Sequence, residues 1–299
     1  MSGFYTNWGP VLDLYLLHLG FAFAQYLVLR AGVFSLATAG LAAIGAYAAG
    51  ILAISYAVNP VIGILAAVAM GTLTALVLSW PLARLRGVYQ AIATLAFVQI
   101  VLSLNIYAEG LTGGAMGLMN IPKVVGTFEL LIAAAAVAYL IWALNTTRLG
   151  RTFDAIRENE AVAVSLGVSV VRYQALAFAL SGGIAGLFGA LEAFHSYALD
   201  PNMFGFPFLI AVLSYVVFGG RKSVLGPIVG TAVLILLPEL ARPLAENRIL
   251  VYGLLLILVI NFLPKGIADT ALDAWRRHRL AQRRGGAAAV RAAVGEGAP

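Results

Sequence analysis

The sequence predicts an all-α polytopic membrane protein with about eight to nine transmembrane helices, and three observations lead to that fold class. The first is composition: 62% of the residues are hydrophobic and only 11% are charged, with a mean hydropathy of +0.94. Soluble domains carry about 25% charged residues. The second is a series of apolar segments near the roughly 20 residues that a membrane span needs. The third is the distribution of basic residues, which gather in alternate connections.

The candidate spans share an apolar composition and are bounded by charged, glycine-rich or proline-containing connections. In chain order they are 11–29, 32–57, 61–83, 88–107, 128–147, 173–197, 204–220, 224–241 and 249–264. Segments 32–50 and 204–220 are interrupted or bounded by glycine. Such interruptions can mark broken helices beside a substrate path, but close helix packing through small residues is the favoured interpretation.

Small residues recur every four positions in several of these segments. The repeats are Gly63, Ala67 and Gly71; Gly182 and Gly186; Ala185 and Gly189; and Gly226 and Gly230. In lipid, such faces let helix backbones approach closely, so that van der Waals contact drives association. The spacing predicts tight helix pairs, either within the chain or between chains.

The basic residues predict the orientation of the chain. If all nine segments cross and the N-terminus lies outside, 16 of the 19 Lys and Arg residues fall on the inner face, and Lys123, Arg242 and Arg248 fall outside. Cytoplasmic connections are enriched in Lys and Arg. We therefore expect a multi-pass protein with an external N-terminus and a cytoplasmic C-terminus.

The charged stretch from Gly150 to Gly167 stands apart from the apolar segments. It contains Arg151, Asp154, Arg157, Glu158 and Glu160, and each charge at a bilayer centre costs about 2.5–3.5 kcal/mol. The stretch also has an apolar edge at helical spacing. The residues of that edge are Phe153, Ile156, Ala163 and Leu166. This pattern predicts a short amphipathic helix on the membrane surface that contacts something soluble.

Two domains are expected from the change in composition near residue 267. Residues 1–267 form a membrane domain that includes the loop 148–172, and residues 268–299 form a basic tail. Leu272, Trp275 and Leu280 lie among arginines in the tail, a pattern typical of an interfacial anchor beside lipid headgroups. Nucleic acid is not an expected partner of so short a segment tethered to a membrane.

Catalytic and nucleotide-binding patterns are missing from the sequence. The fragment GGRKS at 219–223 has Arg221 where a phosphate-binding loop requires glycine before lysine, and LSGG at 180–183 lies within an apolar segment. Thr94, Gln99 and Asn105 are polar residues on segment 88–107 that either line a pathway or form hydrogen bonds between helices. Glu192 and His195 share a helical face near the outer end of their segment, where a capped pair is the favoured interpretation.

Four blocks of the sequence form an ordered set of motifs. They are RAGVFSL at 30–36 with GAY at 45–47; TGG at 112–114 with GL at 117–118 and IP at 121–122; GR at 150–151 with AIRE at 155–158, Glu160 and LG at 166–167; and GG at 219–220 with Ser223, GP at 226–227, Gly230 and LPE at 237–239. Taken in order, these blocks resemble the M-type permease subunit of branched-chain amino-acid ABC importers. The resemblance covers about residues 30–265. Importer loops have Glu-Ala-Ala where this sequence has Ala161, with Glu160 before it and Val162 after it. Arg221-Lys222 replaces smaller residues.

The resemblance implies an ABC importer permease fold with a cytoplasmic coupling helix, within 150–173, that docks in a cleft of an ATPase subunit. The residues implied in that contact are Gly150, Arg151, Asp154, Ala155, Ile156, Arg157, Glu158, Asn159, Glu160, Ala161, Ala163, Leu166, Gly167, Val168, Arg172 and Tyr173. The implied partners are an H-type permease subunit, two ABC ATPases, a periplasmic binding protein and the lipid of a bacterial inner membrane. ATP would be used by the partner ATPases, and no cofactor is expected on this chain.

The function implied by the resemblance is transport by alternating access, with branched-chain amino acids or related small molecules such as urea, amides or aromatic acids as cargo. A stand-alone ion-coupled carrier is the alternative, although such carriers usually place charges at mid-span and the span centres here are nearly free of them. An intramembrane enzyme would need a catalytic constellation that the sequence does not contain.

Overall fold

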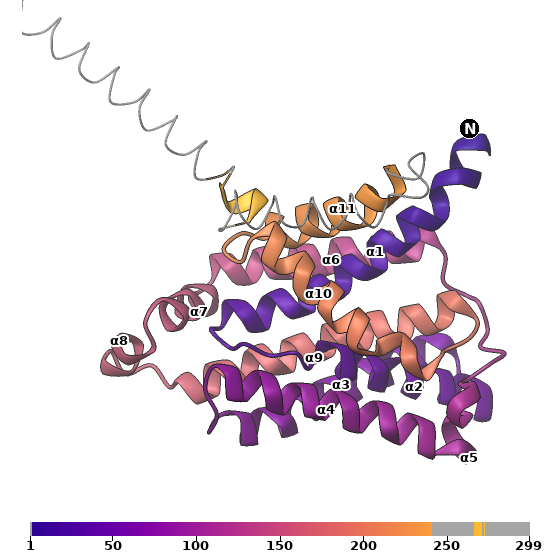
Figure 1. The fold of residues 1–299 in the computed structure, drawn as a ribbon, viewed down its shortest axis with the longest axis horizontal. Helices are drawn as coiled ribbons and strands as arrows, with labels where there is room; N and C mark the ends of the chain where they lie inside the picture. Colours follow the sequence, from indigo (N-terminus) through magenta and orange to yellow (C-terminus); the bar gives the residue numbers. More distant parts are fainter. Residues whose placement is uncertain (1, 241–265, 271, 273–299) are drawn as a thin grey trace, which may run out of the picture.

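The computed structural model describes residues 2–240, 266–270 and 272, which form a bundle of long helices with short connections (Figure 1). In chain order the elements are α1 (Ser2–Arg30), α2 (Thr38–Ser55), α3 (Pro60–Leu82), α4 (Val88–Tyr107), α5 (Glu109–Thr112), η1 (Gly114–Met116), α6 (Thr127–Thr146), α7 (Arg148–Glu158), α8 (Glu160–Ser165), α9 (Val170–Ser196), η2 (Pro201–Phe204), α10 (Phe206–Gly219) and α11 (Leu225–Leu240). The described residues contain no β-strand, and the all-α fold class is confirmed.

Seven helical segments in the described part of the chain are long and apolar enough to cross a membrane. They correspond to the first seven sequence-predicted spans. The eighth, α11, has 16 residues, fewer than the roughly 20 of a typical span. The ninth predicted span, 249–264, lies outside the described residues, as does the tail from 273 to 299.

The second span differs from its sequence prediction, because helix α2 begins at Thr38 and not near residue 32. Gly32 adopts a φ of 80°, which breaks the helical path. The backbone that follows is held by side chains instead: Gln25 Nε2 donates to the Ser35 carbonyl at 2.7 Å. The Leu36 amide donates to Thr94 Oγ1 at 2.9 Å.

Helix α9 forms the centre of the bundle, where it packs against both α2 and α3. Its glycines make this close approach possible. A Cβ on Gly186 would overlap the Ala67 carbonyl of α3, and a Cβ on Gly189 would overlap the Ala42 carbonyl of α2. The small-residue repeats therefore serve contacts within the chain, as does the Gly226–Gly230 repeat, which packs against α10.

Basic residues gather at one end of the bundle, the end at which Figure 1 shows α7 and α8. This end, called the basic end below, comprises residues 30–37, 83–87, 147–172 and 220–224. Nine of the ten Lys and Arg residues in the described part of the chain belong to it, and Lys123 belongs to the opposite end. The alternation of the helices therefore gives the charge asymmetry that the sequence predicted.

The opposite end is closed by backbone pairing between two connections. The amides of Leu118, Ile121 and Val124 donate to carbonyls of residues 199, 197 and 194, respectively. Gly113, Gly114 and Gly117 all have positive φ, so the glycine-rich stretch at 113–122 forms tight turns and lies against the C-terminal end of α9.

Candidate functional site at the basic end

Helix α7 is amphipathic, and its apolar face is turned toward the bundle. Phe153 and Ile156 are buried. The Phe153 ring meets the Tyr173 ring edge to face, with the centroids 6.4 Å apart, and Phe153 clusters with Ala31 and Ala177. Because Phe153 and Ile156 are three residues apart, they lie on one helical face, and that face attaches α7 to the ends of α1 and α9.

The predicted single helix is in fact two helices, because Asn159 interrupts the stretch. Asn159 has an extended backbone (φ −157°, ψ 104°), and its side chain accepts a hydrogen bond from the Val162 amide. Asparagine is among the preferred N-cap residues because its side-chain oxygen can satisfy a free helical amide. Helix α8 then ends before Gly167, which has a φ of 81°.

An ion pair fastens α7 to the end of α1. Arg30 donates from Nε to Asp154 Oδ1 at 3.1 Å and from Nη2 to Asp154 Oδ2 at 2.7 Å. Arg30 is only 4% exposed, and its Nη1 lies 3.5 Å from the Tyr26 hydroxyl. Bidentate guanidinium–carboxylate pairs are both strong and directional. A buried arginine without such a partner is strongly unfavourable, so this contact fixes the position of α7.

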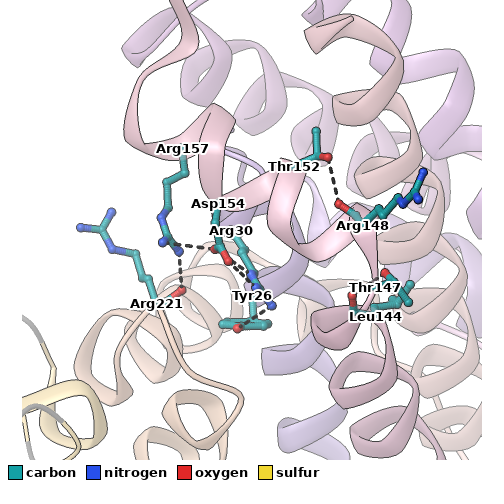
Figure 2. A network of polar contacts seen from close by, with 9 residues as sticks. All are labelled: Tyr26, Arg30, Leu144, Thr147, Arg148, Thr152, Asp154, Arg157 and Arg221. Carbon is teal, nitrogen blue, oxygen red and sulfur yellow. Dashed lines mark hydrogen bonds and ion pairs between the residues drawn. The ribbon is translucent and has the colours of Figure 1, made fainter. Parts of the chain in front are cut away.

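Arg157 extends the same network to the turn between α10 and α11. Its Nη2 lies 3.2 Å from Asp154 Oδ1, and its Nη1 donates to the Arg221 carbonyl at 3.2 Å. Figure 2 shows the side chains of Arg30, Asp154 and Arg157 together, with Arg157 reaching the backbone carbonyl of Arg221. The would-be Cβ of Gly32 lies 3.3 Å from the Arg157 Cα, so the backbones of α7 and the 31–33 turn are also in close contact.

The α10–α11 turn is also hydrogen-bonded to the short helical segment 266–270. The Lys222 amide donates to Asp269 Oδ2 at 2.9 Å. Burial raises the pKa of Asp269, while hydrogen bonds from the backbone of Lys222 and Ser223 act in the opposite direction. Segments near residues 30, 154, 221 and 269 are therefore held together by polar contacts.

Helix α8 exposes apolar side chains that nothing in the described part of the chain covers. Val162, Val164 and Leu166 are 52%, 55% and 76% exposed. The sequence prediction of a single apolar edge is wrong in this respect. Phe153, Ile156 and Ala163 of that edge are buried within the chain, whereas Leu166 is exposed. Ala163, beyond the break at Asn159, still packs against Ile156, and Leu166 follows the last residue of α8.

A cavity of about 320 Å³ lies beside α8, between the α3–α4 turn and the start of α9. An ion pair stands at its edge, with Arg86 Nη2 2.9 Å from Glu160 Oε1. Both side chains are substantially exposed, and such pairs contribute about 0–1 kcal/mol. The cavity wall mixes polar groups such as Gln174 with apolar ones such as Val168.

The sixteen sequence-predicted contact residues divide between the interior and the surface. Gly150, Ile156 and Ala163 are buried; Asp154, Arg157, Glu160, Val168 and Tyr173 are intermediate; and Arg151, Ala155, Glu158, Asn159, Ala161, Leu166, Gly167 and Arg172 are exposed. The prediction did not include Arg30, Arg86, Val162 and Val164 as site residues. Arg30 could have been found as a single charge within an apolar stretch, because such a charge requires a partner.

The three predicted pathway residues do not share one environment. Thr94 is fully buried and bonds to backbone at Leu36 and Gln90. Asn105 is 8% exposed and its Nδ2 has no hydrogen-bond partner. Gln99 is exposed. Thr94 therefore joins α4 to the non-helical backbone at Leu36, whereas Gln99 lies on the exposed surface of the described bundle.

Glu192 and His195 do not pair with each other. Buried Glu192 accepts a hydrogen bond from Ser196 at 3.3 Å, whereas the His195 Nε2 lies 3.7 Å from Asp13 Oδ2. The second imidazole nitrogen of His195 is 3.2 Å from the Val125 carbonyl. Among the described residues, no group of three or more His, Asp or Glu side chains converges as a metal site requires.

Comparison with known proteins adds a family match to this geometry. Residues 12–260 match the family model described as branched-chain amino acid transport system / permease component. The chain is 31% identical over 275 residues to the high-affinity branched-chain amino acid transport system permease protein LivM of Escherichia coli (strain K12). That alignment covers 79% of this chain and 64% of the relative, so the chain spans less than two thirds of the relative's length.

Two further relatives are more distant. The probable branched-chain amino acid transport permease protein LivM of Methanocaldococcus jannaschii is 23% identical over 246 residues, covering 70% of each chain. The fructose import permease protein FrcC of Rhizobium meliloti is 24% identical over 276 residues, covering 85% of this chain and 74% of that relative. No solved structure matches the chain.

Proposed function

Because the chain belongs to the permease-component family of branched-chain amino acid transport systems, we propose that it is the membrane permease subunit of an ATP-driven importer of these amino acids. The spans of this chain would form the translocation path together with a second permease subunit of the H type. Two ATPases would act at the basic end, and a periplasmic binding protein would deliver cargo at the opposite end.

The observation that carries the proposal is the exposed apolar surface of α8 beside the firmly held α7. Val162, Val164 and Leu166 project from the basic end, where the charges of the loop exclude insertion into lipid. Water-exposed apolar side chains in a cluster mark interaction sites. The orientation that we propose places this surface in the cytoplasm, where ATPase subunits are available.

Amino-acid uptake by the assembled complex tests the function. The full chain is produced with a second permease subunit, two ATPases and a binding protein of one importer, and reconstituted in proteoliposomes. We expect leucine uptake that requires both ATP and the binding protein. Uptake without the ATPases would indicate a stand-alone carrier, and ATP-dependent uptake of fructose in place of leucine would contradict the substrate class.

A double substitution on α8 tests the contact surface. Val162→Asp with Leu166→Asp places two charges on the exposed apolar face, and we expect recovery of the ATPases by co-purification to fall at least tenfold because apolar contact is lost. Ser165→Asp adds a charge at an exposed position of the same helix and should retain most of the recovery. Equal recovery of the ATPases by the double variant and the wild type would contradict this surface.

A further inference from the structure

The two halves of the 148–172 loop differ in how they are attached to the bundle. Helix α7 is held to α1 by the bidentate contact of Arg30 with Asp154, at 3.1 and 2.7 Å, and to the α10–α11 turn by Arg157. Its apolar face is buried against α1 and α9 through Phe153. Displacing α7 alone would separate a buried guanidinium from its carboxylate, which is strongly unfavourable.

Helix α8 has no buried ion pair in the described part of the chain, and its buried side chain, Ala163, packs against Ile156 of α7 and Val170 of α9. One ion pair, between Glu160 and Arg86, joins it to the α3–α4 turn in the described part of the chain, and the Arg86 side chain is 81% exposed. Such exposed pairs are weak and are screened by salt. The extended backbone of Asn159 separates α8 from α7, and the positive φ of Gly167 separates it from α9.

We propose that the loop has two parts, in which α8 contacts the ATPase and α7 transmits its displacement, through the Arg30–Asp154 ion pair to α1 and through Arg157 to the α10–α11 turn. Asp154 is thus a positioning residue. The α3–α4 turn, attached through the weak Arg86–Glu160 pair, does not carry the movement. This inference rests on the proposed function. It names the contacts through which ATP hydrolysis by the partner subunits would move the spans.

A pair of matched amide substitutions tests this division. Asp154→Asn removes the carboxylate that pairs with Arg30, and Arg86→Gln removes the Arg86–Glu160 pair from the side of the α3–α4 turn. Both are measured in the reconstituted complex with leucine as cargo. For Asp154→Asn we expect ATPase recovery and ATP hydrolysis within about twofold of wild type, but at least a tenfold fall in leucine transported per ATP. Arg86→Gln should leave that ratio within twofold of wild type, and Asp154→Glu should restore at least half of it.

Three results would overturn the inference: an unchanged ratio in Asp154→Asn, an equal fall in Arg86→Gln, or loss of ATPase recovery in Asp154→Asn. The last would make Asp154 part of the contact and not of the transmission. A wild-type complex that transports no leucine would instead overturn the proposed function, so the two failures are distinguishable.

A covalent tether provides a second measurement that does not depend on one substitution. The chain has no cysteine, so Arg30→Cys with Asp154→Cys creates its only thiols. We expect this double variant to have a low ratio of leucine transported to ATP hydrolysed, and a short bifunctional maleimide that links the two thiols to raise the ratio at least fivefold. A tether between Arg86→Cys and Glu160→Cys should give no such gain. Failure of the first tether to restore the ratio, with cross-linking verified by mass, would contradict transmission through this contact.

Discussion

Thr94 illustrates how single polar residues hold non-helical backbone inside an apolar bundle. Its hydroxyl accepts from the Leu36 amide at 2.9 Å and donates to the Gln90 carbonyl at 2.8 Å. In the same region the Thr38 hydroxyl donates to Gln25 Oε1 at 2.6 Å, and Gln25 Nε2 donates to the Ser35 carbonyl. In lipid no water is available to satisfy backbone groups, so these side chains substitute for the missing helical turn at 31–37.

Replacing Thr94 tests this role. Thr94→Val leaves the Leu36 amide without an acceptor, which costs about 1–3 kcal/mol for a buried group, so we expect a lower thermal unfolding midpoint in detergent. Thr94→Ser keeps the hydroxyl, so its unfolding midpoint should fall less. A valine variant that unfolds at or above the temperature of the serine variant would show that the hydroxyl does not support the turn.

At the scale of elements, the helices of the core are placed by close backbone contact. Helix α9 lies between α2 and α3, and Gly186 contacts both: its Cα occupies the place of a Cβ on Gly45, and its own Cβ would meet the Ala67 carbonyl. In lipid the hydrophobic effect does not drive helices together, so their association depends on such close contacts. The same element that forms the core also begins at the basic end, so α9 connects the 148–172 loop to the centre of the bundle.

A larger side chain at position 186 should therefore strongly destabilise the fold. Gly186→Leu forces a side chain into backbone of α3, and overpacking costs about 1–3 kcal/mol or more, so we expect a lower midpoint in thermal unfolding and a smaller folded yield. Gly110→Leu is the matched control, because nothing lies within 4 Å of a Cβ at that position. Similar losses of thermal stability and folded yield in the two variants would show that the close contact at Gly186 does not determine the stability of the fold.

At the scale of the whole molecule, the two ends of the bundle differ in charge and in construction. The basic end carries nine Lys and Arg side chains and the ion network of α7, whereas the opposite end is closed by backbone bonds between residues 118–124 and 194–199. Since basic connections are retained in the cytoplasm, this asymmetry predicts that the basic end faces inward.

Thiol labelling tests the orientation, because the chain has no cysteine of its own. Ser165→Cys on α8 and Met116→Cys in η1 are both exposed in the structure. We expect a membrane-impermeant maleimide to label Met116→Cys on whole cells and to label Ser165→Cys only after the membrane is permeabilised. The reverse pattern would invert the orientation and remove the ATPases from the α8 surface.

Much of the fold could be predicted because it depends on properties local to each segment. Hydropathy located the seven described spans, the small-residue spacing at Gly182 and Gly186 indicated a tight helix interface, and the distribution of Lys and Arg gave the charge asymmetry. The start of α2 was misplaced because Gly32 lies in an apolar stretch. Its φ of 80° breaks the helical path, and the 31–33 turn lies against the backbone of Arg157, which is distant in the sequence.

The sequence by itself determined that this chain crosses the membrane many times and that residues 150–167 do not form a span. Both conclusions depend on the cost of burying charge and on the length of apolar runs, which each segment shows without reference to its neighbours in space. Only the tertiary structure decided which face of that stretch is covered. Helical spacing assigned Phe153, Ile156 and Leu166 to one edge, but Phe153 and Ile156 are buried in the structure, whereas Leu166, at the end of α8, is exposed. The pair of Arg30 with Asp154, 124 residues apart, holds α7 in place. Contacts over such separations are selected by the packing of whole helices, which no local pattern encodes.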